Sequence, residues 1–300
     1  MIWVDGQMTE SVLASDRGLN YADGLFETMR VVDGGIPLID AHLQRLERDA
    51  ARLGLPVPAS AALKRELAVA ADGTRAGVLK LVLTRGSGGR GYAPSAASPG
   101  RRIISLHPLP DYPSAWYAQG VCVRMCDTVL GSSVAIGGLK HLGRLEQVLA
   151  SREASDGAAE GLMQDAEGRV IEGIRSNLFL LMDGELRTPD VSLSGVAGVM
   201  RTLVIGIAPG LGLDVRIASV QIDDLKRAEA LFLSNSVFGI WPVREVRGVR
   251  PPLVMAGSGP YMGDEAEPDG ESKVGSVPVH PTIRRFMQAA AALGVPSWAG

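Results

Sequence analysis

Several short segments in the first third of the chain alternate between hydrophobic and polar residues, and this period of two predicts β-strands. The pattern places strands at residues 25–32, 78–84 and 102–107. Asp33-Gly34-Gly35 follows the first of them and has the composition of a tight turn. The beginning of the chain is therefore expected to contain short strands.

Apolar residues three and four positions apart predict helices between these strands. The spacing indicates helices at residues 40–53 and 61–71, with Asp40 as the N-cap of the first and Gly54 as its stop. Its apolar face consists of Leu43, Leu46, Ala50 and Leu53. Arg45 then falls on the side expected to be exposed.

Pro108, Pro110 and Pro113 interrupt the pattern and mark a domain boundary, giving domains at 1–113 and 114–300. In the second domain we expect helices at 142–154 and 282–293, and hairpin turns at 165–168 and 183–184, which imply much antiparallel sheet. The segment 250–281 is rich in Gly, Pro, Ser and acidic residues, which predicts a mobile surface loop.

Composition and charge exclude several classes of function. Thirty Lys and Arg residues against 33 Asp and Glu give a net charge of −3, with no basic cluster suited to nucleic acid. No run is long and apolar enough to span a bilayer, and residues 1–6 do not resemble a signal peptide, so we expect a cytoplasmic protein. Cys122 and Cys126 are expected to be buried free thiols, and no metal site is predicted.

Residues 86–91 match the dinucleotide-binding pattern G-x-G-x-x-G and follow a predicted strand. A dinucleotide loop has to open a helix whose N-terminus faces the pyrophosphate, whereas Tyr92-Ala93-Pro94-Ser95 predicts none. The segment is either a flexible hairpin or a loop at the mouth of a cleft. In the second case Arg90 could bind a carboxylate and Tyr92 could pack on an apolar ring.

Two ionisable residues about thirty positions apart carry the candidate chemistry. Lys140 lies between a small-residue loop and a predicted helix, where partial burial would lower the pKa of its amine and favour attack on an aldehyde. Glu172 lies at the end of a predicted strand, where a carboxylate could keep a pyridine nitrogen protonated. Each residue alone is more often an ordinary surface charge, and the pair strengthens the interpretation.

Other segments could hold a phosphate. The glycine-containing segment 195–200 leads into a predicted helix at 201–207, so the backbone N–H groups of Val199 and Met200 would face an anion. Residues 234–236 add hydroxyl and amide donors after a predicted strand at 230–233, and Arg45 could supply a fixed positive charge.

Taken in order, these segments resemble the fold type IV enzymes that use pyridoxal 5'-phosphate (PLP), a group containing branched-chain and D-amino-acid aminotransferases and 4-amino-4-deoxychorismate lyases. Among them the chain most resembles the lyases. The resemblance covers residues 1–245 and rests on the motifs at 15–18, 21–28, 42–46, 85–92, 140–142 and 198–201 and on the segment around Glu172.

The resemblance implies a small N-terminal α/β domain, a larger C-terminal domain with a pseudo-barrel sheet, and a homodimer acting on a small-molecule substrate. It also implies Lys140 as the Schiff-base lysine and Glu172 as the partner of the pyridine nitrogen. The further cofactor-binding residues would be Arg45, Asn177, Val199, Met200, Asn235 and Ser236. The substrate site would include Thr28, Arg30, Arg90 and Tyr92. Two departures stand out, namely Gly143 where the family commonly has Asn, and the unusually long and polar segment 250–281.

Three functions fit these observations. The first is a PLP-dependent lyase that converts 4-amino-4-deoxychorismate to p-aminobenzoate and pyruvate in folate biosynthesis. The second is an aminotransferase for a D-amino acid, a branched-chain amino acid or an amine, which needs the same cofactor groups. The third is a non-catalytic PLP-binding protein, and the presence of both Lys140 and Glu172 argues against it.

Overall fold

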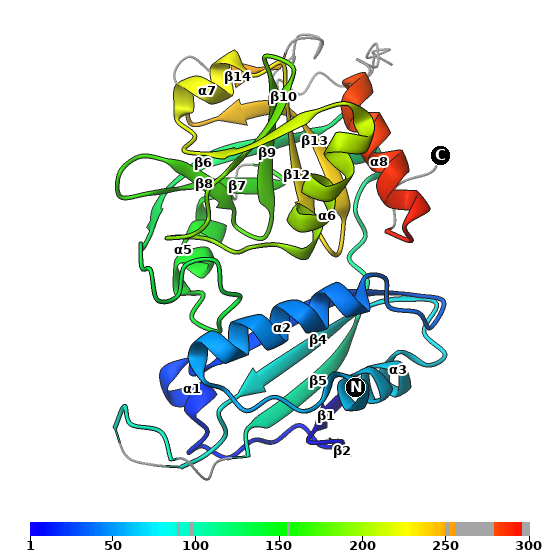
Figure 1. Cartoon of the computed structure of the whole chain (residues 1–300), viewed down its shortest axis with the longest axis vertical. Helices are drawn as coiled ribbons and strands as arrows, with labels where there is room; N and C mark the ends of the chain where they lie inside the picture. Colours follow the sequence, from blue (N-terminus) through cyan, green and yellow to red (C-terminus); the bar gives the residue numbers. More distant parts are fainter. Residues whose placement is uncertain (89–90, 96–98, 155–156, 250–252, 256–278, 296–300) are drawn as a thin grey trace, which may run out of the picture.

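A computed structural model describes residues 1–88, 91–95, 99–154, 157–249, 253–255 and 279–295. The described chain contains two β-sheets (Figure 1), one built before and one after the proline-rich segment that the sequence singled out. The last strand of the first sheet ends at Pro108, and the first strand of the second begins at Val121. The fold mixes helices with two β-sheets, as expected.

The first sheet is antiparallel, with strand order β2-β1-β5-β4-β3. Its strands are β1 (Ile2–Val4), β2 (Gln7–Met8), β3 (Gly24–Val32), β4 (Ala76–Thr84) and β5 (Arg101–Pro108). The helices of this part of the chain are α1 (Arg17–Tyr21), α2 (Ile39–Leu53) and α3 (Ser60–Ala71).

The alternation in β3 separates the two faces of this sheet. Leu25, Met29 and Val31 are buried in a core that includes apolar residues of α2 and α3. Phe26 and Thr28 are half-buried on the other face. Because successive strand side chains point to opposite faces, the first face anchors the helices and the second remains available for a site.

The second sheet has strand order β11-β10-β9-β12-β13-β6-β7-β8. An additional β8–β9 pairing, Glu172 opposite Asn177, joins six of these strands in a closed ring, which is the pseudo-barrel. Its strands are β6 (Val121–Leu130), β7 (Glu160–Asp165), β8 (Val170–Gly173), β9 (Asn177–Met182), β10 (Glu185–Pro189), β11 (Asp214–Ala218), β12 (Ala230–Asn235), β13 (Gly239–Arg247) and β14 (Leu253–Val254).

Helices flank this second sheet (Figure 1), and its apolar core includes residues of α6 and α8. The α-helices are α4 (Ser114–Ala118), α5 (Leu145–Glu153), α6 (Val199–Ile207), α7 (Ile222–Arg227) and α8 (Pro281–Ala292), and a 3₁₀ helix spans Ala208–Leu211. The predicted hairpin turns at 165–168 and 183–184 connect β7 to β8 and β9 to β10.

Three local expectations need correction. Helix α2 begins at Ile39 with Leu38 as its N-cap, so Asp40 lies inside the first turn; Gly54 does form the C-cap, with φ of 60°. Helix α5 begins at Leu145, three residues later than predicted, because residues 140–142 bond to the first sheet. The second sheet is mixed, since β6 runs parallel to both β7 and β13.

Other expectations concern single features. Cys122 and Cys126 are buried free cysteines, as predicted. No helix follows residues 86–88 within the described part of the loop, and the next regular element is β5, which agrees with rejecting the dinucleotide pattern. Most of the segment 250–281 lies outside the described residues. No helix among the residues described here combines the length and apolar character needed to cross a bilayer.

Candidate active site

A cavity of about 530 Å³ is lined by residues from both parts of the chain. The first sheet contributes Phe26, Thr28, Val78, Lys80 and His107, and α2 contributes Arg45. From the second part come Lys140, Arg144, Glu172, Arg175, Ser176, Asn177, Val196, the start of α6 and residues 234–237, among others. This volume is typical of a small-molecule site.

The segment that carries Lys140 is fastened to β3 and α2 by backbone hydrogen bonds. Phe26 N–H donates to Lys140 O at 3.0 Å, and Leu142 N–H donates to Gly24 O at 3.0 Å. Lys140 N–H donates to the carboxylate of Asp49 at 3.2 Å. The lysine thus lies on an irregular segment whose backbone is nevertheless held in place at several points.

The Lys140 side chain lies in the cavity, with Nζ 4.2 Å from the centre of the Phe26 ring. Burial lowers the pKa of its ammonium group to about 7, and the charges of Arg45 and Arg144 act in the same direction. Glu27 and Glu172 oppose this shift. A substantial fraction of the amine is therefore uncharged near neutral pH, as a nucleophile or proton acceptor requires.

Glu172 is buried at the end of β8 and lines the same cavity. Its Oε2 accepts a hydrogen bond from Val196 N–H at 2.8 Å and one from the Asn177 amide at 3.4 Å. Burial raises the pKa of the carboxyl to about 7, although Arg144 and the Val196 hydrogen bond lower it. The pKa of such a buried carboxyl falls strongly when a positive charge is placed beside it.

Two features make the start of α6 suited to an anion. Val199 and Met200 are the first two residues of the helix, so their N–H groups have no partner within it. Gly198 precedes them, and a Cβ at this position would lie 2.0 Å from Asn177 Oδ1. The missing side chain therefore lets Asn177 approach the helix start closely, where its amide also donates to Val196 O at 2.8 Å.

Hydroxyl groups of the cavity wall are available for a ligand. The Oγ atoms of Ser176 and Ser234 are buried and lack a hydrogen-bond partner, and both residues line the cavity. Ser236 lines it as well. Asn235 lines the cavity but uses its Oδ1 to accept from the N–H groups of Val237 and Phe238. A buried hydroxyl without a partner is costly, and a bound ligand would relieve that cost.

Arg45 lies in an environment that differs from expectation. It is buried rather than exposed, and its guanidinium donates to Glu27 at 2.8 and 2.5 Å. It also donates to Ala197 O at 3.3 Å. Periodicity within one helix could not show this, because the covering chain comes from the loop before α6. The pKa of Glu27 falls to about 2 despite its burial, because Arg45 and His42 stabilise the carboxylate.

Arg144 is a cavity residue that the sequence did not single out. Its Nε donates to His141 O at 3.0 Å and one terminal nitrogen donates to Leu139 O at 2.6 Å, so the guanidinium binds the carbonyls on both sides of Lys140. Gly143 lies beside this contact, and a Cβ there would be 3.2 Å from the His141 ring. The His141 ring thus borders the space that a side chain at residue 143 would enter.

The predicted substrate residues are spread over the molecule. Thr28 lines the cavity. Arg30 is not among the lining residues and donates to Val237 O at 2.9 Å. Tyr92 is 88% exposed, packs against Tyr21 with ring centres 5.8 Å apart, and does not line the cavity. Arg90 lies outside the described residues.

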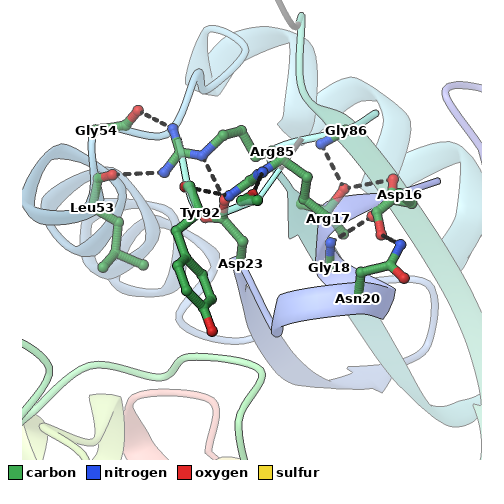
Figure 2. Close-up of polar contacts among 12 residues, drawn as sticks. Asp16, Arg17, Gly18, Asn20, Asp23, Leu53, Gly54, Arg85, Gly86 and Tyr92 are labelled. Carbon is green, nitrogen blue, oxygen red and sulfur yellow. Dashed lines mark hydrogen bonds and ion pairs between the residues drawn. The ribbon is translucent and has the colours of Figure 1, made fainter. Parts of the chain in front are cut away.

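An ion-pair network anchors the loop that carries Tyr92 (Figure 2). Asp23 accepts hydrogen bonds from Arg17 at 2.9 Å and from Arg85 at 2.7 Å. Arg17 in turn donates to Gly91 O at 3.0 Å and to Tyr92 O at 2.8 Å. Charged groups next to the G-x-G-x-x-G pattern therefore position this loop.

Comparisons with known proteins identify the family. The model of the family "Amino-transferase class IV" matches residues 24–246. This chain belongs to that family. PLP is the cofactor of its enzymes, and the chain is accordingly a PLP-dependent enzyme.

Relatives within the family have more than one activity. An aminodeoxychorismate lyase of Vibrio harveyi is 35% identical over 254 residues, covering 81% of this chain and 90% of the relative. A putative branched-chain-amino-acid aminotransferase of Methanocaldococcus jannaschii is 30% identical, covering 82% and 88%. The crystal structure of the 4-amino-4-deoxychorismate lyase of Pseudomonas aeruginosa superposes with a TM-score of 0.85 at 42% identity, covering 97% and 98% of the two chains.

The cavity residues fit PLP. Lys140 offers a largely desolvated amine, Glu172 a buried carboxyl, and the start of α6 two unpartnered N–H groups for a phosphate. The unpartnered hydroxyls of Ser176 and Ser234 indicate polar ligand atoms beside them. A class IV enzyme needs these groups around one cavity, and the fold brings them together from segments far apart in sequence.

Proposed function

We propose that this chain is a 4-amino-4-deoxychorismate lyase that forms p-aminobenzoate and pyruvate, a reaction of folate biosynthesis. The observation that carries the proposal is the match to the Pseudomonas aeruginosa lyase along nearly the whole of both chains at 42% identity. A branched-chain aminotransferase from Escherichia coli with similar coverage is only 25% identical. Substrate preference therefore follows the lyases.

Lys140 and Glu172 are proposed as the residues that carry the chemistry. Bound in the cavity, PLP supplies an aldehyde for a covalent bond to an amine and a pyridinium ring that withdraws electrons from the carbon bearing that amine. Glu172 would face the pyridine nitrogen, where a positive charge returns its carboxyl to the ionised form. Lys140 would hold the cofactor and then, as a free amine, act as base.

The remaining cofactor contacts are proposed at the other end of the cavity. The N–H groups of Val199 and Met200 would bind the phosphate at the start of α6. Ser236 would donate its hydroxyl, and Asn235 would keep this turn in shape through its own backbone contacts. Arg45 would contribute positive charge near the phosphate, although its ion pair with Glu27 partly neutralises that charge.

The substrate reaction requires one base and no second reactant. Lys140 Nζ would take the proton from the amine-bearing ring carbon of 4-amino-4-deoxychorismate. Breaking the bond between the ring and the enolpyruvyl oxygen would then leave the aromatic p-aminobenzoate, and the departing enolpyruvyl group would take up the proton held by Lys140 to become pyruvate. Asn177 would hold Glu172 in position through the contact to its carboxylate.

Thr28, Arg30, Arg90 and Tyr92 remain proposals for the substrate site. Thr28 has direct access to the cavity, whereas Tyr92 lies outside the cavity of its own chain. Contact of Tyr92 with a substrate would therefore require a second copy of the chain or a shift of the loop. We propose a homodimer, which light scattering of the purified protein would test.

We further propose a cytoplasmic protein of two domains, 1–113 and 114–300. Separate apolar cores for the two sheets support the division. Limited proteolysis that cleaves near residue 113 and leaves two resistant fragments would agree with it, whereas fragments divided elsewhere would contradict it.

The decisive assay supplies 4-amino-4-deoxychorismate to the PLP-loaded protein and follows p-aminobenzoate and pyruvate. The lyase proposal predicts equal amounts of both products without any keto acid. The alternative is an aminotransferase, favoured by the family description and by the relatives that carry this name. Amino-group transfer from D-alanine or leucine to 2-oxoglutarate, without p-aminobenzoate formation, would establish that alternative.

A further inference from the structure

One face of helix α2 contacts two segments of the second part of the chain. Arg45, Asp49 and Arg52 are spaced by four and three residues, so their side chains lie on the same side of the helix. Helix α2 runs along the boundary between the two parts of the chain (Figure 1). Arg45 donates to Ala197 O in the loop before α6. The other two side chains contact the segment that contains Lys140.

Arg52 holds the beginning of this segment. Its guanidinium donates to Gly137 O at 3.0 Å and to two further carbonyl oxygens of the turn before it, each at 3.2 Å. The next residue, Gly138, accepts a hydrogen bond at its own carbonyl from Ala197 N–H at 2.9 Å. The chain before Lys140 is therefore attached both to α2 and to the loop before α6.

Asp49 contacts the lysine residue itself. Its side chain is only 1% exposed, and a buried carboxylate needs partners for its charge. Oδ2 accepts a hydrogen bond from Lys140 N–H at 3.2 Å, and Oδ1 accepts from the Arg48 guanidinium at 2.9 and 2.7 Å. Arg48 thus orients the carboxylate through one oxygen, and the other oxygen meets the peptide of Lys140.

The direction of the Lys140 side chain depends on the two peptide groups that flank its Cα. Phe26 N–H donates to Lys140 O at 3.0 Å, which fixes the peptide after the lysine. Arg144 binds the carbonyls of the residues on either side. Asp49 fixes the N–H of the peptide before the lysine. Because a lysine has a long and flexible side chain, the place of its amine depends on how well this starting point is held.

We propose that Asp49 is a positioning residue, which holds the Lys140 N–H so that Nζ is directed at the aldehyde carbon of PLP. The inference rests on the proposed function, in which Lys140 holds the cofactor. The role requires an acceptor oxygen at residue 49. Without this acceptor the Lys140 N–H would be buried and unpaired, and the segment would shift to find another partner.

The test measures how apoprotein variants bind two forms of the cofactor. Lys140 Nζ can form a double bond to the aldehyde carbon of PLP, whose oxygen leaves as water. Pyridoxamine 5'-phosphate has an amine in place of the aldehyde, so it binds only through its ring and phosphate. Asp49→Leu should therefore weaken PLP binding about tenfold and leave pyridoxamine 5'-phosphate binding within about twofold of the wild type. Absorbance follows the first ligand, and tryptophan fluorescence follows the second.

Asp49→Asn keeps an acceptor oxygen and should bind PLP within about threefold of the wild type. Asp40→Leu is the matched control, because Asp40 lies on the same helix and pairs with Lys64 at the surface. This control should bind both ligands as the wild type does.

Three results would overturn the inference. The first is equal PLP affinity of Asp49→Leu and Asp40→Leu. The second is an equal loss of both ligands in Asp49→Leu, because residue 49 would then shape the whole cavity instead of placing the amine. The third is a loss of PLP affinity in Asp49→Asn as large as in Asp49→Leu, since the acceptor oxygen is retained.

The inference and the proposed function can fail separately. Borohydride reduction followed by peptide mass spectrometry shows which lysine carries PLP in the wild type. Attachment at Lys140 without formation of p-aminobenzoate would refute the lyase, and the binding ratios would still decide the role of Asp49. Attachment at Lys140 with an unaffected Asp49→Leu variant would refute only the role of Asp49. Attachment at another lysine would refute both.

Discussion

At the scale of single residues, the charge state of Lys140 depends on neighbours from several elements. Arg45 from α2, Glu27 from β3, Glu172 from β8 and the nearby Arg144 all act on it, in addition to burial. Each of these groups shifts the pH at which the amine becomes a base. The reactivity of the lysine is thus a property of its surroundings rather than of its local sequence.

Replacing Arg144 by Met should raise the pKa of Lys140 above its value of about 7, because a positive charge that disfavours the ammonium is removed. The acidic limb of the kcat profile should move to higher pH, because kcat reports the substrate complex, in which Lys140 is a free amine, and more alkaline conditions are then needed to deprotonate it. Arg144→Lys keeps a charge but loses the two-point contact to the carbonyls flanking Lys140. Arg144→Lys should therefore lower kcat but shift the acidic limb less than Arg144→Met does. Identical pH profiles for the wild type and both variants would refute an influence of Arg144 on Lys140.

At the scale of elements, the start of α6 and strand β9 depend on each other through Gly198. A Cβ at Gly198 would collide with Asn177 Oδ1 at 2.0 Å, whereas a Cβ at Gly206 in the same helix meets nothing within 4 Å. A glycine is thus required at the start of this helix and not in its last turns.

Gly198→Ala should weaken PLP binding about tenfold or more, because Asn177 and the N–H groups proposed to bind the phosphate have to move. Gly206→Ala should leave PLP affinity unchanged and slightly stabilise the helix, since Ala is the better helix former. Titration of each apoprotein with PLP, followed by absorbance, measures the effect. Equal affinities for the two variants would contradict the proposed phosphate site.

Element-level patterns in the sequence predicted much of this arrangement. The alternation of β3, the Gly54 stop and the helix after Gly198 are local signals, and the structure has all three. Lys140 and Glu172 could be singled out because each combines a reactive side chain with a characteristic neighbourhood, and the structure places both in one cavity. The burial of Arg45 could not be predicted, because a loop 152 residues away covers it.

At the scale of the whole molecule, the cavity exists only because the second sheet and its loops face the polar side of the first. Lys80 illustrates the limit of sequence reasoning, since alternation assigns it to the polar face of β4 but does not show that this face borders a cavity. The β8–β9 pairing that closes the barrel joins neighbouring strands, yet the closed ring also needs β6, β12 and β13. Such long-range pairing has no local signature.

Buried carboxyls should make the stability of the cofactor-free protein depend on pH. Burial raises the pKa of Glu160 to about 7 from 4.5, so its stabilising contribution is complete below pH 4.5 and is lost as the pH rises through 7. The free energy of unfolding of the wild type should therefore decrease between pH 5 and 7.5. In Glu160→Gln this decrease should be smaller by about 2 kcal/mol. Urea unfolding at both values measures this, with the exposed Glu167→Gln as control. If Glu160→Gln kept the pH dependence of the wild type, Glu160 would not be the group that causes it.

The rate of p-aminobenzoate formation by Lys140→Ala, measured beside wild type at saturating PLP, tests the central claim most directly. If Lys140 is both the covalent anchor and the base, the rate falls by about a thousandfold or more, because no other described lysine except Lys80 lines the cavity. Lys64→Ala should keep the wild-type rate. A Lys140→Ala enzyme that retains a rate within tenfold of wild type would contradict the account.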